Sequence, residues 1–332
     1  MPFKRNAASW PLFLLISYQV SFLLARNLSV VYVILSVYTG IPDETDDRKD
    51  RIFKKLHTHK GGVMKTGFRL GDFELTWLNG GRFELDGGAM FGVVPKALWS
   101  KKYPSSEDNT IPMVAWPLLI KTPGAHILIE TGLGNKLTDK QKQIFKVTEE
   151  WNLVEDLRSL GIEREDIDYV ILTHYDFDHA GGVVMKEDSG TLSLTFPKAR
   201  HLVQRKEWED VLNPNKRSIN TFWPINYETL KDSNNLELVD GEKEVERGIR
   251  VILTGGHNRG FQIVKMESGN EKALHMVDLL PTHAHFNPLW IMAYDNFPLE
   301  SIAMKEEWEK KGMEEDAWFT FYHDPFVLAC KF

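Results

Sequence analysis

The stretch that most constrains this chain is ILTHYDFDHAGG, at residues 171–182. It begins as an apolar strand, then places two histidines and two aspartates within six residues, and ends in a pair of glycines. Titratable side chains at a strand end are typical of a ligand site, because the sheet fixes the backbone while the loop presents the side chains. The stretch therefore predicts a metal site. Its candidate ligands are His174, Asp176, Asp178 and His179.

Three later strands of the sequence also end in a metal-ligand residue type. The apolar runs IRVILTGG, KALHMV and AWFTFY are followed by His257, Asp278 and His323. The chain has a single cysteine, so a disulfide framework and cysteine-rich zinc sites are excluded, and any metal must be held by histidines and carboxylates. This mixture of ligands suits Zn, Mn or Fe, whereas imidazole makes a poor ligand for Ca²⁺.

Composition narrows the class of partner. The chain has 332 residues, 42% of them hydrophobic, which is enough to bury a sizeable core. Its formal net charge is −7 at pH 7, and the sequence shows no local basic patch. We therefore expect a small-molecule substrate and no nucleic-acid partner.

The first 63 residues differ from the rest. Two apolar blocks, residues 10–25 and 28–41, are separated by Arg26 and Asn27 and followed by a charged linker. The pattern leaves three interpretations open: a membrane anchor, a signal peptide, or a misassigned start with translation beginning at Met64. The first two would make the protein membrane-anchored or exported through residues 1–41, with membrane contact at residues 10–41. The third would make it cytoplasmic, and in each case the folded domain is residues 64–332.

From residue 67 onward, short apolar strands alternate with helical patterns. Residues 138–162 carry apolar residues at helical spacing between a Thr and a Gly, which predicts two helices, and residues 299–312 predict an amphipathic helix. The absence of a 20-to-50-residue repeat favours one layered α/β or α+β domain. The predicted strands are residues 73–81, 117–122, 126–134, 168–174, 200–204, 249–257, 261–267, 272–278 and 317–324.

THYDFDHAGG resembles the His-x-His-x-Asp-His motif of the metallo-β-lactamase superfamily. The later GGH, VD and YHDP follow in the order of that superfamily's remaining ligands. Further segments are similar to the quorum-quenching N-acyl-homoserine-lactonase branch, and the resemblance extends from about residue 68 to residue 325. Those segments are LTWLNGGRFELDGGAMFGVVPKALWSKKYP, LTDKQKQIFKVTEE and HFNPLWIMAYDNFPLES.

The resemblance implies an α+β fold, a four-layer αββα sandwich with two divalent metal ions at one edge of the paired sheets. Zn is the metal that the family implies, and a hydroxide shared by the two ions would attack the carbonyl carbon of a lactone or other ester-like bond. Asp178 or Asp278 would return a proton to the leaving alkoxide. Homodimers are common among such relatives. The implied ligands are His174, Asp176 and His257 for the first ion, Asp178, His179 and His323 for the second, and Asp278 as the bridge.

The sequence departs from the family pattern at three places. Asp176 stands where the motif has a second histidine, and a third carboxylate lowers the net charge of the site. This predicts either a preference shifted toward Mn or Fe or a slower enzyme with a more alkaline pH optimum. Glu130 stands where the superfamily has an aspartate that orients a ligating histidine. No tyrosine follows Asp278 closely, and His283 and His285, which occupy that loop, are expected to be solvated.

Other interpretations remain open at this level. Superfamily members also act on thioesters, aryl esters and organophosphates, so the fold does not choose the substrate. A di-iron redox protein would match the carboxylate at position 176 but needs a flavin domain, and only nine residues follow His323. A degenerate metal-binding homologue is the third alternative. Phe91, Trp99 and Trp290 fit either an acyl-chain pocket or core packing equally well.

Overall fold

The computed structural model describes residues 67–332. Both apolar blocks of the N-terminal segment lie outside the described residues, so the predicted domain boundary, the membrane contact of residues 10–41 and the location of the protein in the cell stay predictions. Within residues 67–332, no helix has both the length and the apolar character needed to cross a bilayer.

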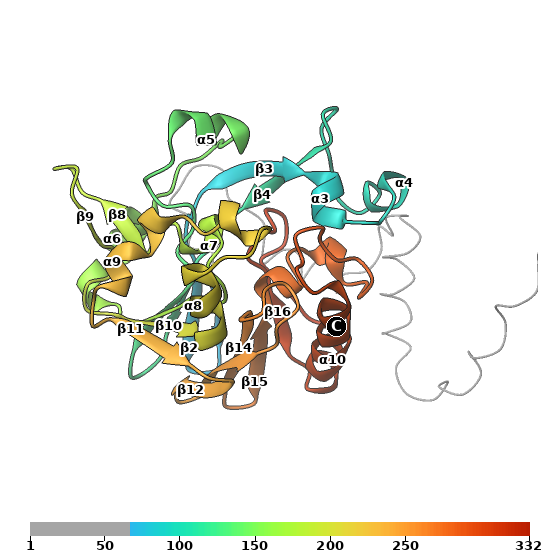
Figure 1. Cartoon of the computed structure of the whole chain (residues 1–332). Coiled ribbons are helices and arrows are strands. Elements are labelled where there is room, and N and C mark those ends of the chain that lie inside the picture. The colour runs from blue at the N-terminus through green and yellow to red at the C-terminus, as the bar shows by residue number, and fades with distance from the viewer. Residues whose placement is uncertain (1–66) are drawn as a thin grey trace, which may run out of the picture. The chain divides into compact units, whose positions relative to one another are not determined.

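Two large sheets form the centre of the fold (Figure 1). The first has seven strands in the order β1 (Gly67–Leu70), β2 (Phe73–Trp77), β5 (Leu118–Lys121), β6 (His126–Ile129), β7 (Tyr169–Ile171), β10 (Arg200–Gln204) and β11 (Leu236–Val239). The second has six, β12 (Glu242–Glu246), β13 (Ile249–Leu253), β14 (Gln262–Ser268), β15 (Glu271–His275), β16 (Trp318–Thr320) and β17 (Ala329–Cys330).

Two hairpins and a set of helices complete the described residues. The hairpins pair β3 (Arg82–Asp86) with β4 (Thr110–Val114) and β8 (Val184–Lys186) with β9 (Leu192–Leu194). The α-helices are α3 (Gly87–Phe91), α4 (Lys96–Trp99), α5 (Asp139–Ile144), α6 (Leu153–Ser159), α7 (Phe177–Ala180), α8 (Arg205–Leu212), α9 (Glu228–Lys231) and α10 (Pro298–Glu314). The 3₁₀ turns are η1 (Arg164–Asp166), η2 (Ser218–Asn220), η3 (Pro224–Asn226), η4 (Val277–Leu279) and η5 (His283–His285).

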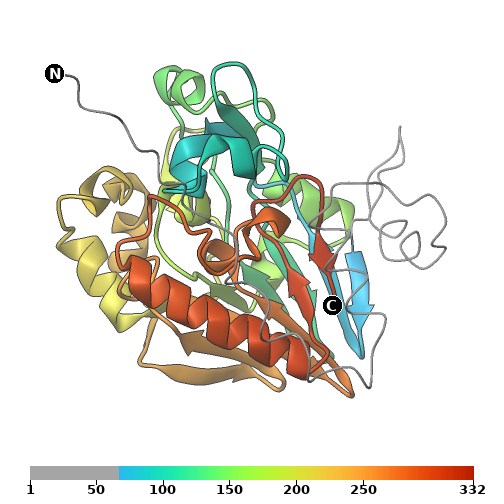
Figure 2. The same cartoon turned by 90° about the vertical axis from the view of Figure 1, so that its right-hand side faces the viewer.

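Alternation along the strands explains how the layers form. In β5, Leu118 and Ile120 join the hydrophobic core between the two sheets, whereas Leu119 joins a second core with Leu157 of α6 and Trp208 of α8. Helix α10 covers the other sheet, and its Gly312 lies so close that an added Cβ would be 2.4 Å from the Phe319 ring. Figure 2 shows α10 across the outer face of that sheet. The predicted α+β sandwich is confirmed.

The predicted pair of helices between residues 138 and 162 is also confirmed as α5 and α6. Thr138 begins α5 in a capping box, its side chain accepting from the backbone N–H of Gln141 while the Gln141 side chain accepts from the N–H of Thr138. Gly161 follows α6 with a φ of 72°, a left-handed conformation that glycine adopts without steric cost. Local sequence signals therefore place both ends of this helical region.

Four strands direct the candidate ligands to one edge of the paired sheets. His174 follows β7, His257 follows β13, Asp278 lies in η4 directly after β15, and His323 follows β16. The sheets hold these strand ends through backbone hydrogen bonds on both sides, so the loops that carry the side chains start from fixed points. The metal-ligand residue types therefore meet although they lie far apart in the sequence.

A buried histidine away from this edge gives a test of the fold. His201 of β10 is fully buried, its Nδ1 donates to the carbonyl of Ala199, and burial lowers its pKa to about 4. An unfolded histidine titrates near 6.5, so folding keeps this imidazole neutral, and its contribution to stability is complete above pH 6.5 and is lost as the pH falls toward 4. We expect the loss to be about 3 kcal/mol and to be absent in His201→Leu. Urea unfolding at several pH values measures it, and equal pH dependence in both proteins would contradict the prediction.

Candidate metal centre

Two groups of three side chains converge at the edge where the strands end. The first group, His174, Asp176 and His257, and the second group, Asp178, His179 and His323, each bring one ligand-type atom per residue to within 4.8 Å of the others. All but Asp176 are buried, and the Asp176 side chain is 17% exposed. These are the two ligand sets that the resemblance implies.

Asp278 lies between the two groups. Its Oδ2 is 3.7 Å from Nε2 of His174 and 3.5 Å from Nε2 of His257. Its Oδ1 is 3.4 Å from Nε2 of His179 and 3.1 Å from Nε2 of His323. Each oxygen of one carboxylate thus faces a different group, which is the arrangement that a bridging ligand requires.

The four imidazoles all turn Nε2 toward the centre and Nδ1 away from it. A polar atom lies behind each Nδ1. For His174, His257 and His323 this atom is within hydrogen-bond distance, and such a contact fixes both the tautomer and the orientation of the ring. Nδ1 of His179 is buried and makes no hydrogen bond with a described residue. The atoms behind Nδ1 are Thr173 Oγ1 at 3.0 Å for His174, Glu130 Oε1 at 3.7 Å for His179, Asp295 Oδ1 at 2.9 Å for His257, and the Val114 carbonyl oxygen at 2.9 Å for His323.

The backbone of the motif combines an extended part with a helical turn. Asp176 has extended dihedral angles and occupies the N-cap position of α7, without a side-chain capping hydrogen bond, and the first turn of α7 contains Asp178 and His179. This turn lies so close to the loop after β6 that a Cβ on Gly181 would be 2.3 Å from the carbonyl oxygen of Leu133. The paired glycines therefore allow the close packing that brings positions 178 and 179 back toward 174 and 176.

Burial and mutual charge dominate the electrostatics of the centre. Burial holds the pKa of His174 well below its usual value, and the His179 imidazole adds to this effect. Burial alone would raise the pKa of Asp278, but the imidazoles of His179 and His323 outweigh it and hold that pKa well below its usual value. The pKa of Asp178 is raised, chiefly by burial. The charged forms of these residues depend on one another.

The side chains that are present fit a pair of divalent cations. Nε2 of His174 and Oδ1 of Asp278 are buried and make no hydrogen bond with any described residue. Buried polar atoms are rarely left unpaired, and imidazole nitrogens with carboxylate oxygens are the ligand set of Zn, Mn and Fe. Glu130 also lies near His174 and His179, but Oε1 accepts from the Thr173 N–H at 3.0 Å, which favours an orienting role behind His179.

Several residues near the centre were not identified from the sequence. Asp295 contacts Nδ1 of His257. Glu207 is buried and accepts a hydrogen bond from the backbone N–H of Tyr175. Burial raises the pKa of Glu207 to about 8, and the charge of Asp176 adds to this shift. Tyr294 is partly exposed, and its pKa is raised to about 12 by burial and by the charges of Asp178 and Asp86. These residues lie in loops and at the start of a helix, where no sequence motif or spacing marks them as part of the site.

The expectation that His283 and His285 are solvated was wrong for His285. His285 is fully buried, its Nδ1 lies 2.8 Å from the Thr282 hydroxyl, and its Nε2 donates to the carbonyl of Met90. His283 is partly exposed, and its Nδ1 lies 2.5 Å from Oδ2 of the buried Asp324. The loop folds back on α3 at His285, whereas the partner of His283 lies in the segment after β16.

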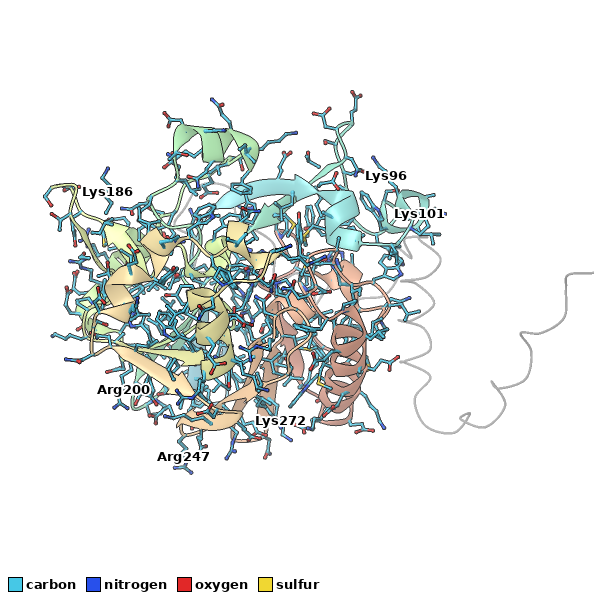
Figure 3. All side chains as sticks on the ribbon, viewed as in Figure 1. Lys96, Lys101, Lys186, Arg200, Arg247 and Lys272 are labelled. Atoms are coloured by element: carbon cyan, nitrogen blue, oxygen red, sulfur yellow. The ribbon has the colours of Figure 1, made fainter. Side chains whose placement is uncertain are left out.

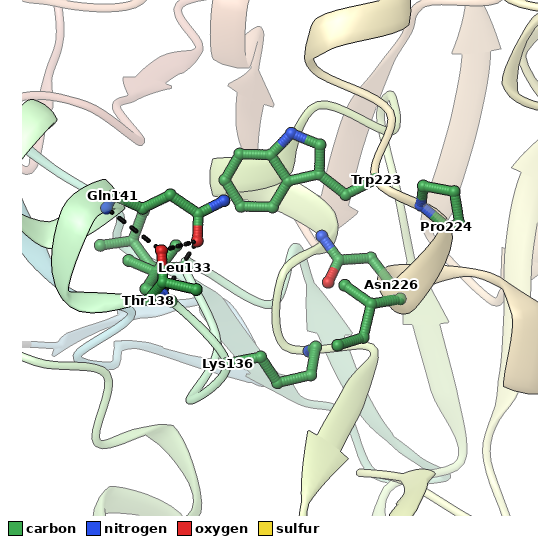
Figure 4. Close-up of a pocket in the computed structure, with 9 residues that line it drawn as sticks. Leu133, Lys136, Thr138, Gln141, Trp223, Pro224 and Asn226 are labelled. Atoms are coloured by element: carbon green, nitrogen blue, oxygen red, sulfur yellow. Dashed lines mark hydrogen bonds between the residues drawn. The ribbon is translucent and has the colours of Figure 1, made fainter.

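The aromatic residues divide between core and cavity. Phe91 and Trp99 are buried in the core, where their rings stack with centroids 4.8 Å apart. A cavity of about 280 Å³ lies elsewhere, between the segment before α5 and η3 (Figure 4). Its wall includes Trp223, which stacks on Phe177, the residue between Asp176 and Asp178. The lining residues are Leu133, Lys136, Leu137, Thr138, Gln141, Trp223, Pro224, Ile225 and Asn226.

Cationic side chains are spread over the described part of the chain. Figure 3 shows Lys96 and Lys101 at α4, and Arg247 and Lys272 at the far end of the second sheet. Lys186 and Arg200 lie at further separate places in the same view. The expectation of no nucleic-acid partner and the expectation of a homodimer both stay predictions.

Comparison with known proteins identifies relatives of the chain. An N-acyl homoserine lactonase of Bacillus thuringiensis is 29% identical over 164 residues, which is 46% of this chain and 58% of that protein. Another from a Bacillus species is 27% identical over 223 residues, 63% of this chain and 80% of that protein. The chain thus spans little more than half the length of the first of these relatives.

Solved structures show the same architecture. A probable metal-dependent hydrolase from Staphylococcus aureus is 42% identical with a TM-score of 0.76, and the match covers 80% of this chain and 94% of that one. A dizinc quorum-quenching lactonase, solved in complex with its product, is 24% identical with a TM-score of 0.67, and the match covers 79% of this chain and 91% of that one. The second likeness shows the fold alone.

The family model of the metallo-beta-lactamase superfamily matches residues 111–300, more than half of the 332 residues. The matched range contains the whole HYDFDH motif, His257 and Asp278. The chain therefore belongs to the metallo-beta-lactamase superfamily.

Proposed function

We propose that this chain is a metal-dependent hydrolase that opens the ring of an N-acyl-homoserine-lactone-type substrate at a centre of two divalent ions. The observation that carries the proposal is the position of Asp278, whose two oxygens face the two groups of ligand-type side chains. The names of the lactonase relatives support the choice of a lactone among ester-like substrates.

The residues of the centre have distinct parts in this proposal. His174, Asp176 and His257 would hold one ion, Asp178, His179 and His323 the other, and Asp278 both. When bound, such ions polarise a substrate carbonyl and make a water nucleophilic at neutral pH. The chain itself orients the imidazoles of His174, His257 and His323 through hydrogen bonds at their Nδ1 nitrogens, which keeps these donors in place without substrate.

The carboxylates carry the proton in the proposed reaction. Water adds to the acyl carbon, the bond between that carbon and the ring oxygen breaks, and the product is an N-acyl-homoserine with a free hydroxyl and a carboxylate. One proton of the attacking water passes through Asp178 or Asp278 to the leaving alkoxide oxygen, and the second is released to solvent when the new carboxylic acid ionises.

The cavity beside Phe177 would hold the acyl chain. Leu137 and Ile225 offer apolar contact, and Trp223 links the cavity to the motif through its stack on Phe177 at a centroid distance of 4.8 Å. An amide-linked alkyl chain gains free energy in such a cavity in proportion to the apolar area that it buries.

The first test joins metal content to turnover. Protein expressed from Met64 should contain two divalent ions per chain by elemental analysis and should hydrolyse members of a lactone panel. Asp176→Ala should lose one ion, and its turnover should fall by about 100-fold or more, because even the loss of a residue behind a metal ligand costs about 10- to 100-fold. One ion or none in the unaltered protein, with no turnover of any lactone, would overturn the proposal.

The metal preference depends on Asp176. Because a third carboxylate donates more negative charge than an imidazole would, protein stripped of metal and reloaded should turn over faster with Mn or Fe than with Zn. Asp176→His, which restores the second histidine of the motif, should reverse this order. Rates that are equal or highest with Zn in the unaltered protein at neutral pH would contradict the explanation.

Chain-length selectivity tests the cavity. Ile225→Ala should raise KM for a ten-carbon acyl lactone roughly 5-fold, about 1 kcal/mol of lost apolar contact, and leave a four-carbon substrate unchanged. Ile219→Ala is the matched control, because Ile219 is 57% exposed and does not line the cavity. Equal changes for both chain lengths, or the same change in the control, would place the acyl chain elsewhere.

A further inference from the structure

The segment between η5 and α10, residues 286–297, runs beside the candidate metal centre without a helix or strand of its own. It follows the buried His285 and ends at Pro298, where α10 begins. A segment of this length without regular structure needs partners for its backbone carbonyls, because its own residues do not pair with one another in a ladder. Two cationic side chains supply those partners.

Lys305 holds the first half of the segment from inside the fold. It lies on α10, its side chain is almost completely buried, and its Nζ donates to the carbonyls of His285, Asn287 and Trp290 at 2.7, 3.3 and 2.8 Å. An ammonium group has three protons and no acceptor, so all its donors are used by two carbonyls of the segment and by that of His285, which directly precedes it. Burial of a lysine is costly unless its charge is satisfied, which makes the contact a specific one.

Arg217 holds the second half from the outer side. Its Nη2 donates to the carbonyl of Ala293 at 2.6 Å, and its Nε donates to the side-chain oxygen of Asn296 at 3.0 Å. The backbone N–H of Asn296 then donates to the carbonyl of His257 at 2.9 Å, and that of Phe297 donates to the carbonyl of Gly256 at 2.9 Å. The end of the segment is thus attached to the loop that carries a candidate ligand.

Asp295 completes the connection. One carboxylate oxygen accepts from the backbone N–H of Met292 at 3.0 Å, within the segment, and the other lies 2.9 Å from Nδ1 of His257. With its Nδ1 bound in this way, His257 points Nε2 toward Asp176 and Asp278, at 3.4 and 3.5 Å. The carboxylate that orients this imidazole therefore depends on the conformation of residues 286–297.

We propose that Asp295 is a positioning residue for the His174, Asp176 and His257 group, and that Lys305 sets its position by fixing the segment from α10. This inference rests on the proposed two-metal function and adds that one of the two metal sites depends on the helix packed outside the second sheet. The other group does not share this dependence, because Nδ1 of His323 donates to the carbonyl of Val114 and Nδ1 of His179 faces Glu130.

The decisive variant is Asp295→Ala, measured by metal binding. Unaltered protein and variant are stripped, reloaded with Zn²⁺, and titrated with a chromophoric chelator, with circular dichroism as the check of folding. We expect the variant to keep one ion at unaltered affinity and to bind the other about 10- to 100-fold more weakly, the usual effect of removing the partner behind a ligating histidine. Two ions bound as tightly as in the unaltered protein would overturn the proposal.

Three further variants separate orientation from general damage. Asp295→Asn keeps an oxygen that can accept from His257 and should weaken the same ion less than Asp295→Ala does, so it also carries the test if the alanine variant does not fold. Lys305→Met keeps the length of the apolar stem, and it should weaken the same ion and speed proteolytic cleavage within residues 286–297. Lys310→Met is the matched control, because that lysine is on the same helix with its side chain 75% exposed, and it should behave as the unaltered protein.

The outcomes distinguish this inference from the proposed function. If the unaltered protein binds a single ion and Asp295→Ala weakens that ion, the positioning role holds and the two-metal function is wrong. If Lys305→Met and Lys310→Met lose Zn²⁺ equally, the role of Lys305 is overturned. If the unaltered protein binds no Zn²⁺, both proposals fail.

Discussion

The structure depends on four buried imidazoles and three carboxylates, of which only that of Asp176 is partly exposed, within a few ångströms of one another. Such a cluster is costly in a protein interior unless opposite charges and hydrogen bonds compensate it. Compensation is incomplete among the described residues, because Nε2 of His174 and Oδ1 of Asp278 make no hydrogen bond. The cluster therefore has the chemistry of a cation site. Because removing these polar side chains from water costs free energy, the surrounding fold must keep them together.

The two sheets provide that support because they supply ligand-type residues from strands that are far apart in the sequence. β7 belongs to the first sheet, whereas β13, β15 and β16 belong to the second, and all four direct a candidate ligand to the same edge. Behind the imidazoles, the partners are more varied, since a threonine, a glutamate, an aspartate and a backbone carbonyl each face one Nδ1. Rigid strands set the distances, and the hydrogen bonds at Nδ1 set the ring orientations of His174, His257 and His323.

Much of this arrangement could be predicted before the fold was known. The motif at residues 174–179 and the positions after three later strands predicted the side chains that the structure brings together, and the helix pair was placed by Thr138 and Gly161. Local sequence patterns did not predict the contacts between loops around the site. His285 was expected in solvent, but the loop folds back on α3 and buries it, and Asp295 carries no spacing that relates it to His257. Such contacts depend on backbone paths that hydrophobic periodicity does not encode.

The sequence by itself determined the residue types that can bind metal, their positions at strand ends, and the layered α+β class, because each follows from a local pattern of apolar and titratable residues. Only the tertiary structure decided that the oxygens of Asp278 face two separate groups, that the cavity lies beside Phe177 rather than at Phe91, and that Lys305 reaches the segment before α10. The reason is physical. A pattern fixes which face a residue takes on its own element, whereas a contact between elements depends on how sheets and helices pack against one another.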